Sequence, residues 1–461
     1  MTPRGRRPPS RWWPWQATAS WWPWLALWTA VGFAIRLATV LGRPHRVAGG
    51  DPYYYHSAAN LLVAGKGFIN PFLYYGWQHQ TVPTAAFPPG FVFVLAPVSL
   101  VGLKSFFAHR IWCCVIGAGA IVVCGLTGRE IAGRPAGLIA AFLVAVYPNL
   151  WMSDELGLSE TLTPVVVALV LLAAYRFWKR PDWVPALWLG VSIGVAALAR
   201  DELGLLALLL LAPLALSART LSWGRRATVL AVGGLAALVT VAPWVGYNLS
   251  RFQDPVFISS GLGVTLASAN CDTTYQGPFE GYWSYQCALA APLRHDVDES
   301  VQGSEAQRYA LHYVRTHTGR IVPVELARFG RSFGLFHPLQ QIHLDSMIET
   351  RPYRWALVGL GMYYCMLPLA IGGAVLLRRR RVPVLPLLAV GLDVVVSTAI
   401  SFGNTRYRTA FEVPLILASA VMLEWIWRSW GGHNPRHTAI AGEEASRAEA
   451  SGVAGPPART W

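Results

Sequence analysis

Charged residues are scarce in this chain of 461 residues. They make up 13% of it, about half of the roughly 25% found in soluble domains. Hydrophobic residues make up 54% and gather in long runs, which excludes a disordered chain and argues against a soluble enzyme. The composition therefore predicts an all-α polytopic membrane protein.

Lysine is nearly absent. Only Lys66, Lys104 and Lys179 occur among 38 basic residues, which leaves 38 − 3 = 35 arginines and a net charge of +14. Most of the excess arginine lies in short loops beside apolar runs. This is the positive-inside pattern of membrane proteins, and we therefore expect a bilayer rather than nucleic acid as the partner of the basic charge.

Cysteine is also sparse, with six residues. None belongs to a zinc-binding pattern such as C-x-x-C, and four lie inside apolar runs. Cys271 and Cys287 lie in a long polar segment, for which a disulfide in an oxidising compartment is the better interpretation.

The apolar runs predict about ten transmembrane helices. They cover residues 21–41, 105–126, 135–150, 161–177, 183–199, 203–217, 228–246, 355–377, 383–400 and 410–427. Residues 87–103 are apolar but short, and a crossing there would move Arg129 and Arg134 outside. We therefore expect a surface-lying or half-inserted helix at 87–103.

The arginine pattern also orients the chain in the inner (plasma) membrane, with both termini cytoplasmic. Residues 1–20 form a basic cytoplasmic arm, and residues 428–461 a disordered cytoplasmic tail. Residues 21–246 hold seven spans and a first outer loop at 42–104 with juxtamembrane helices. The larger outer loop is 247–354, and residues 355–427 hold the last three spans.

This orientation gathers ionisable residues on the outer side. Arg200, Arg406 and Arg408 oppose the positive-inside bias there, so each needs an anionic partner. A lipid phosphate or diphosphate suits the arginine fork; the alternative is pairing within the protein, for example of Arg200 with Asp201 or Glu202. The acids predicted on this side are Asp51, Asp154, Glu155, Glu160, Asp201 and Glu202.

Asp51 stands in the segment Gly49-Gly50-Asp51-Pro52-Tyr53-Tyr54-Tyr55-His56. It is either the N-cap of a following amphipathic helix or a general base for an acceptor hydroxyl. His56 either orients that carboxylate, binds the acceptor or is an ordinary surface histidine, and His337 has similar standing. Asp393 lies inside a predicted span, where it serves helix packing or a polar relay.

Several motifs in this order resemble the GT-C glycosyltransferases. The first outer loop reads G-D-x-Y-Y-Y-H-x-A-x-x-L-x-x-G-x-G-F, and it is most similar to family 39, the protein O-mannosyltransferases and aminoarabinose transferases, in their actinobacterial form. The other matching segments are Phe87-Pro88-Pro89-Gly90, Ser159-Glu160-Thr161-Leu162, Ala199-Arg200-Asp201-Glu202 and Arg406-Tyr407-Arg408.

The resemblance implies a GT-C fold and an enzyme that moves a hexose or pentose from a polyprenyl-phosphate donor to an extracytoplasmic lipid, glycan or protein acceptor of the cell envelope. Asp51 would be the catalytic base of an inverting transfer, with Asp154, Glu160 and Asp201 as candidate supporting acids. Arg200, Arg406 and Arg408 would bind the donor phosphate. Sugar or acceptor contacts would come from Tyr53, Tyr54, His56, Tyr74, Tyr75 and Trp77, although an interfacial aromatic belt is the alternative for the aromatic side chains.

The chain departs from the family pattern at two positions. Pro52 stands where many relatives have a second acid, and Phe87 replaces a basic residue before Pro-Pro. The metal-using oligosaccharyltransferases carry D-x-D in the second outer loop, whereas this chain has Asp154-Glu155. We therefore expect no required metal and no other cofactor.

Two other functional classes remain open. A flippase or transporter of lipid-linked sugars would also use outer arginines, but it predicts internal repeats and polar residues through the membrane. A non-catalytic membrane scaffold leaves the outer arginines unexplained.

Overall fold

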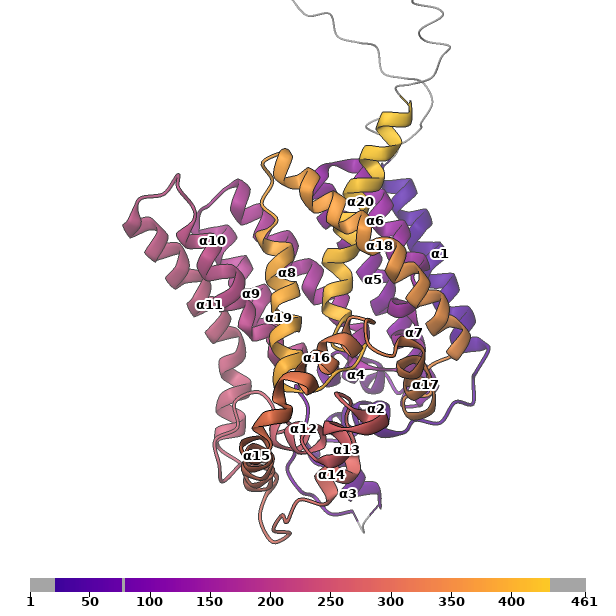
Figure 1. The fold of residues 1–461 in the computed structure, drawn as a ribbon, viewed down its shortest axis with the longest axis vertical. Coiled ribbons are helices and arrows are strands. Elements are labelled where there is room, and N and C mark those ends of the chain that lie inside the picture. The colour runs from indigo at the N-terminus through magenta and orange to yellow at the C-terminus, as the bar shows by residue number, and fades with distance from the viewer. Residues whose placement is uncertain (1–20, 77–78, 432–461) are drawn as a thin grey trace, which may run out of the picture.

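The computed structural model describes residues 21–76 and 79–431, and it is built from helices (Figure 1). Among these residues the only β pairing is one isolated antiparallel bridge between Ile69 and Pro83. The all-α fold class predicted from the sequence is therefore confirmed.

Six helices are long and apolar enough to cross a membrane. They are α1 (Trp21–Leu41), α5 (Phe106–Ala132), α8 (Thr163–Lys179, preceded by the 3-10 turn Ser159–Thr161), α11 (Trp223–Leu249), α18 (Tyr353–Arg379) and α20 (Thr409–Gly431). A seventh crossing arises if α6 (Arg134–Val146) and α7 (Pro148–Leu156) count as one span bent by 49°. Pro148 explains the break between them, because proline lacks the N–H that would continue the helix.

Three of the ten predicted spans do not meet this standard. The helices α9 (Trp183–Ala199) and α19 (Leu385–Ile400) have 17 and 16 residues, or about 25 Å at 1.5 Å per residue, short of a 30 Å hydrocarbon core. The segment 201–216 is irregular, with a 3-10 turn (Asp201–Leu205), a π turn (Ala207–Leu211) and α10 (Ala212–Leu216). By length and composition, six or seven spans qualify, and the predicted count of ten is not confirmed.

The helices α8 and α20 form the centre of the bundle and are its most buried spans. Small residues let the helices approach closely, as membrane helix packing requires. A Cβ on Gly190 of α9 would lie 2.0 Å from the carbonyl oxygen of Gly233 in α11, so a larger residue at position 190 would force these two helices apart.

The two long connecting segments lie at one end of the bundle, the lower end in Figure 1, which we call the loop end. Residues 42–104 contribute α2 (Gly50–Val63), α3 (Pro71–Gly76) and α4 (Gly90–Leu100). Residues 250–352 contribute α12 (Leu262–Ala269), α13 (Asp272–Tyr275), α14 (Tyr285–Leu289), α15 (Glu299–Thr316), α16 (Ile321–Ser332) and α17 (Pro338–Ile348), with 3-10 turns at Gly277–Phe279 and Thr318–Arg320. A disulfide joins Cys271 to Cys287 in this segment, the pair expected from the sequence.

Candidate active site

A buried carboxylate, Glu160, organises the candidate site at the loop end. It lies in the 3-10 turn that precedes α8, and its side chain has 0% exposure. Glu160 Oε1 accepts hydrogen bonds from Arg406 Nε at 2.6 Å and from Arg200 Nη1 at 3.0 Å. Two of the three arginines selected from the sequence therefore meet on one acid.

Asp51 joins this cluster through Arg406. Its Oδ2 lies 2.8 Å from Arg406 Nη1, and its side chain is 30% exposed. The helix α2 begins at Gly50, and its N-cap, Gly49, makes no side-chain cap bond. Asp51 thus stands in the first turn and pairs with a guanidinium, which favours the site interpretation over the capping one.

Two further acids flank the arginines. Arg200 Nε donates to Glu202 at 2.5 Å, and Arg406 Nη1 lies 3.8 Å from Glu349. Burial raises the pKa of Glu349, while Arg351 and Arg406 oppose the shift. The two arginines therefore have carboxylates as their neighbours, and an incoming anion competes with these carboxylates.

Arg351 is a third arginine at this site. Its Nε donates to Glu349 Oε2 at 2.9 Å, and its charge acts on Glu160. Two buried polar atoms, Arg351 Nη2 and Glu160 Oε2, have no hydrogen-bond partner among the described residues. Buried polar atoms are normally satisfied, so this pair marks a place where a ligand would complete the hydrogen bonding.

Tyr55 lines the same cluster from α2. It is 3% exposed, and its hydroxyl is hydrogen-bonded to Ser159. Burial raises its pKa, and the neighbouring carboxylate of Asp51 raises it further. Tyr55 therefore stays a neutral phenol beside the acids.

Arg408 does not join the cluster. Its side chain is 3% exposed and pairs with Glu412 in the first turn of α20, with Nε 2.7 Å from Oε1. The guanidinium carbon lies 3.8 Å from the ring centroid of Tyr363, and Glu412 also accepts from the Tyr147 hydroxyl at 2.8 Å. These contacts favour a structural role for Arg408 over the predicted contact with the donor phosphate.

Asp154, a predicted supporting acid, is paired away from Asp51. Its Oδ2 accepts from Arg36 Nε at 2.6 Å, and both side chains are buried. Arg36 also donates to the carbonyls of Val144 and Ala145, which the break before Pro148 leaves free. A Cβ on Gly117 would lie 2.2 Å from Asp154 Oδ2, so glycine makes room for this pair. Asp154 thus holds the α6–α7 bend.

Asp201 lies at the edge of the site. It is exposed, and its Oδ2 accepts from the hydroxyl of Ser259 at 2.5 Å. This bond connects the end of α9 to the 250–352 segment, while the adjacent Glu202 is the partner of Arg200. Among the three predicted supporting acids, Glu160 alone contacts the arginines of the cluster.

The predicted aromatic contacts are divided between core and surface. Tyr54 is 2% exposed and belongs to the core, which excludes it from sugar stacking. Tyr53 packs against Phe72, with ring centroids 5.2 Å apart. Tyr74 and Tyr75 contact each other at 5.2 Å, and Tyr75 is 49% exposed. Trp77 lies outside the described residues.

His56 faces α5 rather than Asp51. Its Nδ1 lies 3.1 Å from Nδ1 of His109, whose Nε2 is 2.9 Å from the Ser99 hydroxyl. His56 therefore joins α2 to α4 and α5. Burial lowers the pKa of His56 to about 4, so it is neutral at neutral pH.

The sequence did not decide the roles of His337 and Asp393, and the structure places them in different surroundings. His337 is the N-cap of α17 in a left-handed conformation (φ 45°) and packs edge-on against Phe336. Asp393 is fully buried in α19, and neither carboxylate oxygen has a hydrogen-bond partner among the described residues. Within the described ranges, no three His, Cys, Asp or Glu side chains gather where they could hold a metal ion.

Comparisons with known proteins agree on the fold. Residues 86–247 match the sequence model of a family described as dolichyl-phosphate-mannose-protein mannosyltransferase. Among curated protein sequences, none matches this chain significantly.

Solved structures cover most of the chain. The Archaeoglobus fulgidus oligosaccharyltransferase tethered with an acceptor peptide has 16% identity over 92% of this chain and 52% of its own, with a TM-score of 0.54. The same protein in complex with an inhibitory peptide and a dolichol-phosphate has 15% identity, 97% and 53% coverage, and a TM-score of 0.53. ArnT from Cupriavidus metallidurans bound to undecaprenyl phosphate has 15% identity, 87% and 78% coverage, and a TM-score of 0.45.

The likeness to the oligosaccharyltransferase gives this chain a GT-C fold, as the motifs predict. The chain spans about half the length of that protein.

Proposed function

We propose that this protein is a membrane glycosyltransferase that moves a sugar from a polyprenyl-phosphate donor to an extracytoplasmic acceptor. One observation carries the proposal: Arg406 bridges Asp51 and Glu160, and Arg200 binds the same Glu160. A proton acceptor and two phosphate-binding groups thus lie within one hydrogen-bonded cluster.

The donor phosphate replaces Asp51 as the partner of Arg406. Arg406 Nη1 is held by Asp51, while Glu160 holds its Nε. When a lipid phosphate arrives, its oxygens take the Nη1 position and Glu160 keeps the guanidinium oriented. Arg–phosphate bonds are charge-assisted and suit this fork. The carboxylate of Asp51 is released from Arg406 only when the donor phosphate binds. Asp51 therefore becomes available as a base only when the donor is present.

The transfer then follows from the released carboxylate. The acceptor hydroxyl oxygen attacks the anomeric carbon, and the bond from that carbon to the phosphate oxygen breaks. The lipid phosphate leaves with the electron pair, and Arg200 and Arg406 stabilise its growing negative charge. The hydroxyl proton moves to Asp51, which acts as general base. Attack opposite to the leaving phosphate inverts the sugar configuration.

The location of the cluster suits a lipid substrate. Glu160 lies in the turn just before α8, Arg200 follows α9 and Arg406 precedes α20, so all three stand at the ends of apolar helices. A polyprenyl chain lying among apolar helices would bring its phosphate to this level. The start of α1 lies at the other end, where Trp21 Nε1 donates to the Arg134 carbonyl. Positive-inside orientation then puts the loop end on the extracytoplasmic side of the inner membrane.

Two comparisons support a polyprenyl-phosphate donor. The family model that matches residues 86–247 is described as using dolichyl-phosphate-mannose. The oligosaccharyltransferase of similar fold was solved with a dolichol-phosphate. These proteins are distant in sequence, and the choice of donor therefore rests on the arginines of this chain.

Release of lipid phosphate tests the proposal directly. We expect the purified protein in proteoliposomes to convert one of a panel of polyprenyl-phosphate hexoses and pentoses into free polyprenyl phosphate, measured by mass spectrometry of the extracted lipids. Lipid-linked sugar that crosses the bilayer without releasing free phosphate would instead identify a flippase.

A matched pair of variants tests the donor site. Arg406→Gln removes a charge-assisted bond and should weaken donor binding by about tenfold or more, measured by titration with polyprenyl phosphate. Arg315→Gln removes one exposed charge at the end of α15 and should leave binding unchanged. If both variants lose the same donor affinity, the effect comes from the net charge of the protein, and Arg406 is not a ligand of the donor phosphate.

A further inference from the structure

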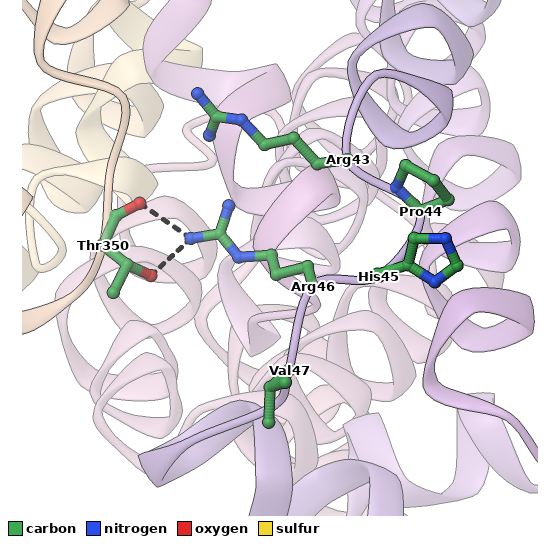
Figure 2. Close-up of a pocket in the computed structure, with 6 residues that line it drawn as sticks. All are labelled: Arg43, Pro44, His45, Arg46, Val47 and Thr350. Atoms are coloured by element: carbon green, nitrogen blue, oxygen red, sulfur yellow. Dashed lines mark hydrogen bonds between the residues drawn. The ribbon is translucent and has the colours of Figure 1, made fainter.

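A second basic site lies beside the first turn after α1. A pocket of about 560 Å³ is lined by Arg43, Pro44, His45, Arg46, Val47 and Thr350. Figure 2 shows the guanidinium groups of Arg43 and Arg46 pointing toward the side occupied by Thr350, while the ring of His45 turns the other way. The motifs discussed above do not include these residues.

Positively charged side chains outnumber carboxylates around this pocket. Three arginines, Arg43, Arg46 and Arg110, share the single carboxylate of Glu155, which is 2% exposed. Arg110 and Arg46 lie 2.9 and 2.6 Å from Glu155 Oε1, whereas Arg43 is 3.8 Å from Oε2. The neighbouring Arg36–Asp154 pair is balanced.

Four arginines therefore face two acids, 4 − 2 = +2. Like charges at this spacing repel each other unless an anion compensates them.

Two of the three arginines on Glu155 have a structural role that explains them. Arg110 donates to the carbonyls of Glu155 and Arg43, which anchors the chain after α1. Arg46 gives both Nη1 bonds to Glu155, at 2.6 and 2.8 Å, and its Nη2 bonds to Thr350. This arginine joins the 42–49 segment to the residues just before α18.

Arg43 has no such role. Its guanidinium is 49% exposed and makes no hydrogen bond with another described residue. The hydroxyl of Thr350 accepts a bond from Arg46, which leaves its own proton to donate into the pocket. The half-exposed guanidinium of Arg43, which is 3.8 Å from Glu155, and the hydroxyl of Thr350 thus line a pocket with two surplus positive charges.

We propose that this pocket binds a phosphate monoester. Such a group carries a charge of about −1.5 to −2 at neutral pH, which matches the surplus, and its oxygens suit the guanidinium fork. Arg43 and the Thr350 hydroxyl bind it directly, and Arg46 holds Thr350 in position. Thr350 follows Glu349, which lies 3.8 Å from Arg406. The pocket is therefore separate from the Arg200–Arg406 cluster, but its residue Thr350 is the chain neighbour of Glu349 in that cluster. A molecule that carries a phosphate in this pocket could reach toward Asp51.

Residue-resolved arginine modification tests this site in the intact wild-type protein. The protein in phosphatidylcholine nanodiscs is treated with phenylglyoxal, and modification of Arg43 is followed by peptide mass spectrometry. Glycerol 3-phosphate is the probe, with sodium chloride at equal ionic strength as control for screening. We expect the probe to slow modification of Arg43 by about tenfold at ten times its Kd. Arg315, exposed on α15, is the internal control and should not be protected.

A second arm identifies the source of the phosphate. Nanodiscs that contain phosphatidic acid protect Arg43 without soluble probe if a lipid headgroup occupies the pocket, whereas protection by glycerol 3-phosphate alone identifies a soluble or acceptor-borne phosphate. Thr350→Val should reduce either protection severalfold. Modification of Arg43 that neither probe slows more than that of Arg315 would overturn the proposal. Because the readout needs no turnover, it is independent of whether the protein transfers sugar.

Discussion

Replacing Arg408 by Gln tests whether this arginine stabilises the bundle or binds the donor. Arg408 and Glu412 are 3% and 2% exposed, and their Nε–Oε1 distance is 2.7 Å. Removing the cation leaves Glu412 buried with only the Tyr147 hydroxyl at 2.8 Å and the Asn149 amide at 3.4 Å. Breaking one side of a buried pair costs about 3–5 kcal/mol, and loss of the contact with Tyr363 adds to this.

The assay is thermal unfolding of the detergent-solubilised protein, followed by tryptophan fluorescence at a fixed scan rate. Arg408→Gln should lower the melting temperature by several degrees, whereas Arg408→Gln with Glu412→Gln should recover most of the loss, because the second change removes the unpaired charge. Arg406→Gln should cost less stability, because Glu160 keeps Arg200 and Asp51 is partly exposed to water. If Arg408→Gln melts like the parent but no longer binds polyprenyl phosphate, Arg408 is a donor ligand and its structural assignment is wrong.

Two further predictions concern stability. Because burial lowers the pKa of His56 to about 4 from 6.5, the unfolded chain binds its proton first as the pH falls. The stability contributed by neutral His56 is complete above about pH 6.5 and is lost toward pH 4, and it amounts to at most about 3 kcal/mol at 1.36 kcal/mol per unit of pKa. The melting temperature of His56→Gln should therefore depend less on pH in this range than that of the parent. An unchanged pH profile would contradict the buried, neutral state of His56. Replacing Cys271 and Cys287 by Ser opens a loop with a sequence separation of 16, worth about 3 kcal/mol in the chain-entropy model; limited proteolysis should then cut within 250–352 faster than in the parent, and equal rates would mean that the disulfide does not order this segment.

The main residues of the candidate site could be predicted because the arginine pattern indicates which loops lie on which side of the membrane. Arginines that oppose the positive-inside bias pointed to Arg200 and Arg406, and motif order pointed to Asp51 and Glu160. The structure brings these four together. The pairing of Arg408 could also have been predicted, since Glu412 lies four residues later, the spacing of a helical ion pair.

Other participants were not readable from the sequence. Glu349 and Arg351 lie in the polar 250–352 segment, where short helices and turns give no periodic pattern, and only the folded chain brings them to Arg406. The number of spans could not be determined from the sequence, because an apolar run of 16 or 17 residues is typical both of a short crossing and of a buried core helix. Arg36–Asp154 shows a related limit, because a pair separated by 118 residues depends on how α1 packs against α7.

The most direct measurement of the central claim compares turnover and donor binding in Asp51→Asn. The substitution keeps the size of the side chain but removes its ability to accept the acceptor proton, so release of free polyprenyl phosphate should fall by about 10²–10⁴-fold. The neutral amide also competes less for Arg406 than the carboxylate does, so polyprenyl phosphate should bind as tightly as in the parent or more tightly. Turnover within a few-fold of the parent, or donor binding lost together with turnover, would contradict the claim that the donor phosphate replaces Asp51 on Arg406 and frees it as the base.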